Sequence, residues 1–164
     1  SPQILQLLSR KVDRDFIEYL VRTTIETVEY ALGRPTLHLF SFPSTIPRPL
    51  LQLALDVIRK SRIDTPVILV ALVYLERARS QFKISDQRWA CERILIGALV
   101  LAAKYVSDYT IKNARWARWS GVFSKEDIGR MERELLDILD WNLSLAEGDI
   151  MAHHEHLLSL TPPT

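Results

Sequence analysis

The chain lacks the residues that build disulfide-stapled, fibrous or membrane-spanning proteins. It has one cysteine, Cys91, so no internal disulfide can form, and a single free thiol fits a reducing cytosolic or nuclear compartment. Glycine is scarce, at 5 of 164 residues, and 48% of the chain is hydrophobic, which favours packed regular structure. The longest apolar run, Ile94 to Ala103, falls well short of the roughly 20 residues that cross a bilayer. We therefore expect a globular protein with no membrane contact, and a buried helix at this run.

A large charge excess is also missing. Lys and Arg total 21 against 20 for Asp and Glu, a net charge of +1, so the chain has no overall basic field to attract nucleic acid. No basic segment followed by an apolar one opens the sequence, which is the pattern of a secretory signal. We expect an intracellular protein, in the nucleus, the cytoplasm or both, with no nucleic acid among its partners.

The sequence contains no recognisable catalytic motif. A glycine-rich phosphate loop, a nucleophile elbow and a zinc-protease motif are all absent. His153, His154 and His156 offer too few ligands for a metal site, and we interpret them as surface residues. Cys91 has no histidine at a spacing that would activate it, and we interpret it as a small buried core residue. We expect no enzymatic activity, no cofactor and no metal.

Apolar spacing and end signals predict an all-α fold. Thr65 is a candidate N-cap before Pro66 and an apolar run, and Ser124 with Asp127 forms a capping box. A connector with scattered apolar residues Leu37, Leu39 and Phe42 runs from Arg34 to Arg48. A polar connection with room for a short helix spans Ser107 to Val122 and closes at Gly121. The expected helices are Asp13–Leu32, Pro49–Lys60, one starting after Thr65, Asp86–Val106, one from Ser124 to Trp141, and one from Gly148 or Asp149 to Leu160 before the Thr161-Pro162-Pro163 stop.

Two charged residues lie directly beside residues that are expected to be buried and apolar. Lys104 directly follows the long apolar run, and Glu132 borders the stripe that Met131 and Leu135 send into the core. In one reading, Lys104 extends its ammonium into water and Glu132 pairs with a nearby cation, purely as structure. In the other, both meet on one surface and bind a partner through charge-assisted hydrogen bonds. Spacing alone does not choose between the two.

The order of three segments resembles a cyclin box. The segments are Asp64-Thr65-Pro66 with Leu72, Tyr74-Leu75 and Arg77; Ala102-Ala103-Lys104-Tyr105; and Arg130-Met131-Glu132 with Leu136 and Leu139-Asp140-Trp141-Asn142-Leu143. The match covers about Pro49 to Leu160 and looks most like the fungal PCL-type cyclins, with Lys104 to Gly121 similar to their cell-cycle branch. It implies a single five-helix cyclin box (49–160) with a C-terminal helix. The box would follow an N-terminal helix and proline-containing connector (1–48) and precede a short tail (161–164).

The resemblance also implies roles for four residues. In cyclins the Lys and Glu of these segments contact the kinase's regulatory C-helix region, so Lys104 and Glu132 would do so here. Tyr105 would pack against the kinase, unless it is a buried core tyrosine. Asp108 would pair with an arginine near the kinase activation segment, unless it is a solvated residue after a helix end. The helix Pro49–Lys60 lacks the Met-Arg-x-x-Leu pattern of the substrate-docking patch in cell-cycle cyclins.

The function that the resemblance implies is that of a cyclin. The chain would bind and allosterically activate a cyclin-dependent kinase of the type bound by PCL cyclins and help set its substrate choice. It would meet the kinase's substrates indirectly, in cell-cycle or morphogenesis control. Two other functions stay open: a cyclin-fold transcription factor that touches DNA, against which the near-neutral charge argues, and a helical scaffold without a kinase partner.

Overall fold

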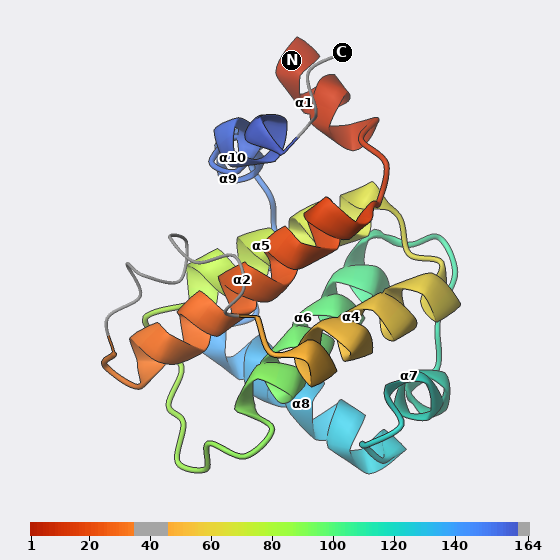
Figure 1. Ribbon diagram of the computed structural model, residues 1–164, viewed down its shortest axis with the longest axis vertical. Coiled ribbons are helices and arrows are strands. Elements are labelled where there is room, and N and C mark those ends of the chain that lie inside the picture. The colour runs from red at the N-terminus through yellow and green to blue at the C-terminus, as the bar shows by residue number, and fades with distance from the viewer. Residues whose placement is uncertain (35–45, 161–164) are drawn as a thin grey trace.

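The part of the chain that the computed structural model describes, residues 1–34 and 46–160, contains α-helices as its regular elements (Figure 1). This confirms the all-α prediction. Residues 35–45 of the predicted connector, including Leu37, Leu39 and Phe42, and the 161–164 tail lie outside the described residues. In chain order the helices are α1 (Pro2–Leu8), α2 (Arg14–Ala31), α4 (Arg48–Ser61), α5 (Thr65–Ala78), α6 (Ala90–Val106), α7 (Asn113–Ser120), α8 (Lys125–Ile138), α9 (Glu147–Met151) and α10 (His154–Ser159).

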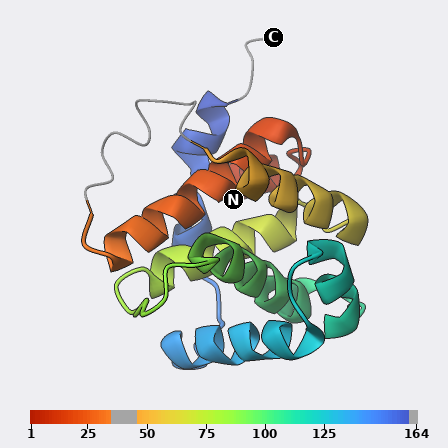
Figure 2. The same cartoon turned by 60° about the horizontal axis from the view of Figure 1, so that its bottom comes forward.

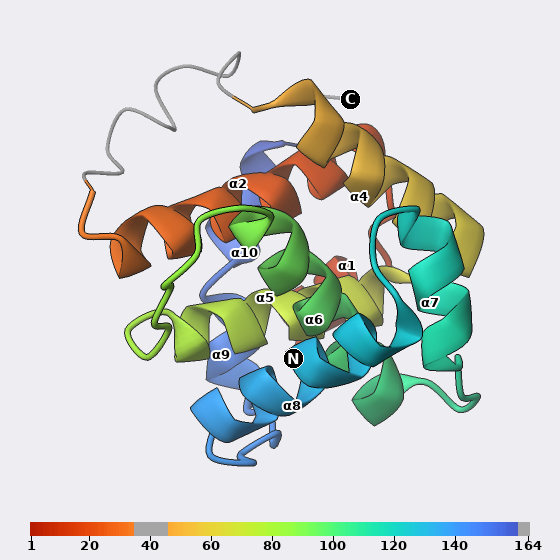
Figure 3. The same ribbon diagram turned by 90° about the horizontal axis from the view of Figure 1, so that it is seen from below.

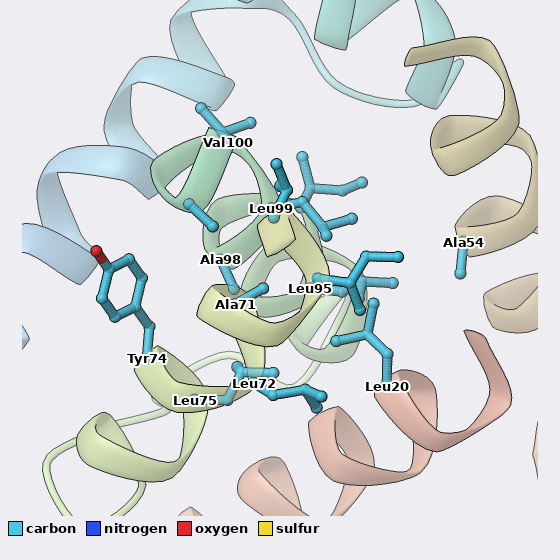
Figure 4. Close-up of a cluster of buried hydrophobic side chains, with 14 of the residues drawn as sticks. Leu20, Ala54, Ala71, Leu72, Tyr74, Leu75, Leu95, Ala98, Leu99 and Val100 are labelled. Atoms are coloured by element: carbon cyan, nitrogen blue, oxygen red, sulfur yellow. The ribbon is translucent and has the colours of Figure 1, made fainter. Parts of the chain in front are cut away.

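Helices α5 and α6 form the centre of the domain. Both apolar runs are buried, from Val67 to Leu75 in α5 and from Leu95 to Ala103 in α6. The two helices pack against each other, and α2, α4 and α8 pack around them (Figure 3). In the close-up, Leu72 and Leu95 point into a shared cluster that Leu20 of α2 also enters (Figure 4). Burying each such side chain contributes roughly 1.5–3 kcal/mol. The predicted core helix at Ile94 to Ala103 is confirmed.

Two predicted helix starts need correction. Asp64, not Thr65, occupies the N-cap position of α5, and the Thr65 hydroxyl instead donates to the carbonyl oxygen of Arg10. Helix α6 begins at Ala90 rather than Asp86, because the Asp86 carboxylate accepts hydrogen bonds from the backbone and guanidinium of Arg88 and holds a loop there. Thr65 and Asp86 are both residue types that commonly begin a helix, but here each side chain forms a hydrogen bond outside the helix that was predicted to start there.

The boundaries of α7 and α8 follow local sequence signals. Gly121, with a φ of 72°, ends α7 in the left-handed region that glycine tolerates. Ser124 and Asp127 then make the predicted capping box, with bonds of 3.1 and 3.0 Å between each side chain and the other residue's backbone N–H. Helix α8 ends at Ile138, before the predicted Trp141, because Asp140 and Trp141 adopt left-handed φ values of 52° and 57°.

The two ends of the chain differ most from the prediction. Helix α1 was not expected, and the single helix predicted before Leu160 is divided into α9 and α10. His153, interpreted as a surface residue, is buried, and its Nδ1 lies 2.8 Å from the Tyr19 hydroxyl of α2. The chain turns inward at this contact, between the two short helices.

Cys91 is partly exposed at the edge of the core rather than fully buried. Burial, followed by the nearby carboxylates of Glu92 and Glu29, raises the pKa of its thiol to about 12, so the thiolate does not form at neutral pH. The prediction that it is no nucleophile agrees with this environment.

Candidate protein-binding surface

Lys104 and Glu132 meet on the surface between α6 and α8. The Lys104 ammonium donates a hydrogen bond to Glu132 Oε1 at 2.7 Å, although the residues belong to different helices. The Lys104 side chain is 31% exposed and that of Glu132 is 15% exposed, so both reach solvent while lying partly over the core. The two side chains converge, as the partner-binding reading requires, and the same contact is also the pairing of Glu132 with a nearby cation that the structural reading allows.

Helices α6 and α8 lie side by side next to the charged pair (Figure 3). A Cβ atom built at Gly97 of α6 would lie 3.4 Å from the Cβ of Met131 in α8. Lys104 follows Gly97 along the same face of α6, and Glu132 directly follows Met131. A small residue at position 97 therefore leaves room for α8 at the crossing that lies next to the charged pair.

The ion pair contributes little to the stability of the fold, and both of its side chains can form further hydrogen bonds. A partly exposed pair of this kind stabilises a fold by about 0–1 kcal/mol. An ammonium has three donors and a carboxylate has about four acceptor positions, of which this bond uses one on each side. A partner that approaches the pair finds both donors and acceptors in a partly dehydrated setting, where charge-assisted hydrogen bonds are strongest.

Tyr105 lies beside the pair and is 49% exposed, which rules out the reading as a buried core tyrosine. It neighbours Tyr74 of α5, whose phenol donates to the carbonyl oxygen of Leu143 at 3.0 Å. Burial, and then the proximity of Tyr105, raises the pKa of the Tyr74 phenol, so this tyrosine stays neutral. The exposed ring of Tyr105 offers an apolar contact directly after Lys104 in the chain.

Asp108 is exposed, two positions beyond the end of α6 at Val106, as both readings of it require. Tyr109 beside it is 58% exposed and was not singled out from the sequence. The one sequence signal that could have identified Tyr109 is the presence of an aromatic residue in a polar connection. Four exposed residues thus lie within residues 104–109 at the end of α6: Lys104, Tyr105, Asp108 and Tyr109.

The described residues place limits on other kinds of site. Within residues 1–34 and 46–160, no group of three or more His, Cys, Asp or Glu side chains is arranged to hold a metal ion. Over the same residues, no helix combines the length and apolar character needed to cross a membrane. The helical domain presents a charged pair and exposed tyrosines on its outer face, and aromatic residues are enriched in protein-binding surfaces.

The sequence family described as "Cyclin, N-terminal domain" matches residues 42–144 of this chain. The chain belongs to the cyclin family, and the matched residues include helices α4 to α8.

Relatives of known name support the PCL-type assignment. The chain is 31% identical to PHO85 cyclin-1 of Saccharomyces cerevisiae over 93% of its own length and 56% of that protein. It is 27% identical to PHO85 cyclin-2 of the same yeast, over 90% of the chain and 48% of the relative. Cyclin-P3-1 of Oryza sativa subsp. japonica is 32% identical over 54% of this chain and 37% of that protein. The chain thus spans about half the length of the yeast relatives it matches. No solved structure matches it significantly.

Proposed function

We propose that this cyclin binds a cyclin-dependent kinase of the type that pairs with PHO85 cyclins and stabilises the kinase's active conformation. The single observation that carries the proposal is the contact between Lys104 and Glu132 at 2.7 Å on the outer face of a cyclin box. The names of the yeast relatives, which link them to the PHO85 kinase, support the choice of partner. Such a partner acts inside the cell, in the nucleus or the cytoplasm.

Each residue of the surface has a defined task in this proposal. Lys104 and Glu132 donate and accept charge-assisted hydrogen bonds with the region around the kinase's regulatory C-helix. The ring of Tyr105 packs against apolar kinase surface, where an aromatic side chain buries a large area. Asp108 pairs with an arginine near the kinase activation segment and supplies negative charge of the kind that phosphorylation adds.

The mechanism is a population shift in the kinase. A rigid helical face that fits the kinase with its C-helix turned inward raises the share of molecules in that conformation. The kinase's own Lys–Glu pair then forms, and phosphoryl transfer becomes competent. The cyclin takes no chemical part in the transfer and acts as a regulatory subunit, which serves cell-cycle or morphogenesis control and influences which substrates the kinase meets.

Affinity capture from a fungal extract, followed by mass spectrometry, tests the proposal. The wild-type chain should retain a kinase, and the double variant Lys104→Ala, Glu132→Ala should lose it while keeping its helical circular dichroism. The double variant Asp86→Ala, Arg88→Ala is the matched control, because it removes another exposed ion pair, of 3.1 Å, from the α5–α6 loop. A folded Lys104/Glu132 variant that captures the kinase undiminished would remove both residues from the interface. Capture of no kinase by the wild-type chain would favour a scaffold or DNA-binding role.

A further inference from the structure

Basic side chains gather where the end of α4 lies against α7. The sequence between Asp56 and Asp64 and the sequence between Asp108 and Glu126 contain Lys and Arg but no acidic residue. Helix α4 packs against α7, and its last turn lies beside α7 in two views (Figures 2 and 3). We call the exposed basic residues of these two neighbouring segments the basic surface; they are Arg59, Lys60, Arg62, Lys112, Arg115 and Arg118.

Asp56 and Asp64 flank the α4 members of the basic surface, but Asp56 accepts a hydrogen bond from Gln52 at 2.8 Å and forms no ion pair with Arg59 or Lys60. Other cations of the domain are paired, such as Arg79 with Glu26 at 3.0 Å and Arg77 with Asp149 at 3.2 Å. Within residues 1–34 and 46–160, no member of the basic surface forms an ion pair with a carboxylate. The chain's net charge of +1 therefore conceals a local concentration of positive charge.

Arg115 is held in place by aromatic side chains. Its guanidinium lies 5.1 Å from the ring centroid of Trp119, one helical turn further along α7. Trp119 in turn meets the fully buried Trp116 edge to face, with ring centroids 5.6 Å apart. A guanidinium stacked on a ring keeps its N–H edge directed outward, in the fork geometry that binds carboxylate or phosphate oxygens in pairs. This arginine is thus ordered before any ligand arrives.

The start of α7 adds positive potential to the same face. Lys112 occupies the N-cap position, its side chain makes no cap hydrogen bond, and the first turn holds no acidic residue. Most helices place an acceptor or a carboxylate there, because their first N–H groups point outward with partial positive charge. Here that charge is reinforced by Lys112 and Arg115 instead.

We propose that the basic surface binds acidic segments, rich in Asp, Glu or phosphoserine, of the proteins that the bound kinase phosphorylates. This rests on the proposed function for the choice of partner, since only the loop 107–112 separates α7 from the end of α6, where the kinase would dock. Clustered anions on a protein segment fit better than nucleic acid, because the chain lacks the broad basic field that draws a polyanion from a distance. The surface would hold a substrate next to the kinase and so bias substrate choice.

Fluorescence anisotropy with the whole chain tests this without any kinase. The probes are a labelled peptide of alternating Glu and Ser, its phosphoserine form, and a form with Gln in place of Glu. The test variant is Lys60→Gln, Arg115→Gln, Arg118→Gln, and the control variant is Lys11→Gln, Arg48→Gln, Lys83→Gln, which removes the same charge from exposed positions outside the basic surface. The test variant should weaken binding of the acidic peptides about tenfold or more, and the control should leave it nearly unchanged. Arg115→Lys, which keeps the charge but loses the planar fork, should weaken it less.

Equal weakening by the two triple variants would overturn the inference, as would equal binding of the Gln peptide. A duplex oligonucleotide that binds the chain more tightly than the acidic peptides would also overturn it, in favour of nucleic acid. The same variants keep the two proposals separate. The test variant should still capture the kinase, whereas Lys104→Ala with Glu132→Ala should lose the kinase and still bind the acidic peptides.

Discussion

The centre of the domain and its two chain ends are held by different kinds of contact. In the centre, α6 packs between α5 and α8 through apolar side chains such as Leu99, which is 0% exposed. The chain ends form a terminal layer of the short helices α1, α9 and α10, which sit together away from α4 and α7 (Figure 1). Two polar contacts help to hold this layer: Arg10 donates to the Leu157 carbonyl at 3.2 Å, and Tyr19 meets His153.

The candidate interface lies on the densely packed centre, whereas the terminal layer is attached to the domain more loosely. Lys104 and Glu132 stand on the two helices of the centre, so their geometry depends on dense packing that tolerates little change. The terminal layer makes fewer buried contacts and exposes apolar side chains, with Leu5 68% and Leu158 37% exposed. We expect the terminal layer to open locally without disturbing the candidate interface.

The largest expected effect compares one leucine from each region. Leu99→Ala should lower the free energy of unfolding by about 2–5 kcal/mol, because the buried side chain leaves a cavity. Leu158→Ala in α10 should lower it by about 0.5 kcal/mol or less. Chemical denaturation of both variants gives the comparison, and equal losses would show that the terminal layer is part of the same tightly packed unit.

A smaller effect is expected where the two central helices cross. Gly97→Val should cost about 1–3 kcal/mol, because its branches would press on Met131 and move α8 away from α6. That movement should separate Lys104 from Glu132 and abolish kinase capture. Gly97→Ala is the matched control, since its Cβ fits at an ordinary contact distance of 3.4 Å. If the valine variant binds the kinase as the alanine variant does, the crossing does not position the pair.

The smallest effect concerns pH and the terminal layer. Burial lowers the pKa of His153 below its ordinary value of 6.5, opposed by Glu76 and assisted by His156, while Tyr19 meets its Nδ1. The unfolded histidine therefore takes up a proton first as pH falls. The contribution of His153 to the free energy of unfolding should be complete above about pH 6.5. It should decline below that pH, by at most about 1.4 kcal/mol per pH unit.

Hydrogen exchange of the α10 amides as a function of pH measures this contribution. His153→Gln should remove the pH dependence, whereas His156→Gln, at an exposed position of α10, should keep most of it, because burial is the larger cause of the lowered pKa of His153. Acid-induced exchange that persists unchanged in His153→Gln would assign the effect to another group.

The features that the sequence predicted well are those with a local cause. The apolar run of α6 and the capping box of Ser124 and Asp127 depend on neighbours within a few residues, and both are present. The burial of His153 depends on Tyr19, 134 residues away, and periodicity carries no such information. The sequence pattern therefore predicted one exposed helix where the structure has two short helices, α9 and α10, with the buried His153 between them.

The candidate interface was predictable only in part, for the same reason. Resemblance to a family selected Lys104 and Glu132, but their contact depends on how α6 and α8 pack together, which no spacing rule indicates. The basic surface was hidden because the ends of α4 and α7 become neighbours only through packing. The overall charge even argued against it, since acidic residues elsewhere balance the total.

The most direct test of the central claim is a calorimetric titration of the captured kinase with the wild-type chain, Lys104→Met, Glu132→Gln and the combined variant. If the pair binds the kinase, each single variant should weaken affinity, and truncating such a desolvated charge typically costs about 2–5 kcal/mol. The combined change should also be smaller than the sum of the two, because the side chains act on one partner surface. Affinities within about twofold of wild type for all three folded variants, less than ~0.5 kcal/mol, would contradict the claim that this surface binds the kinase.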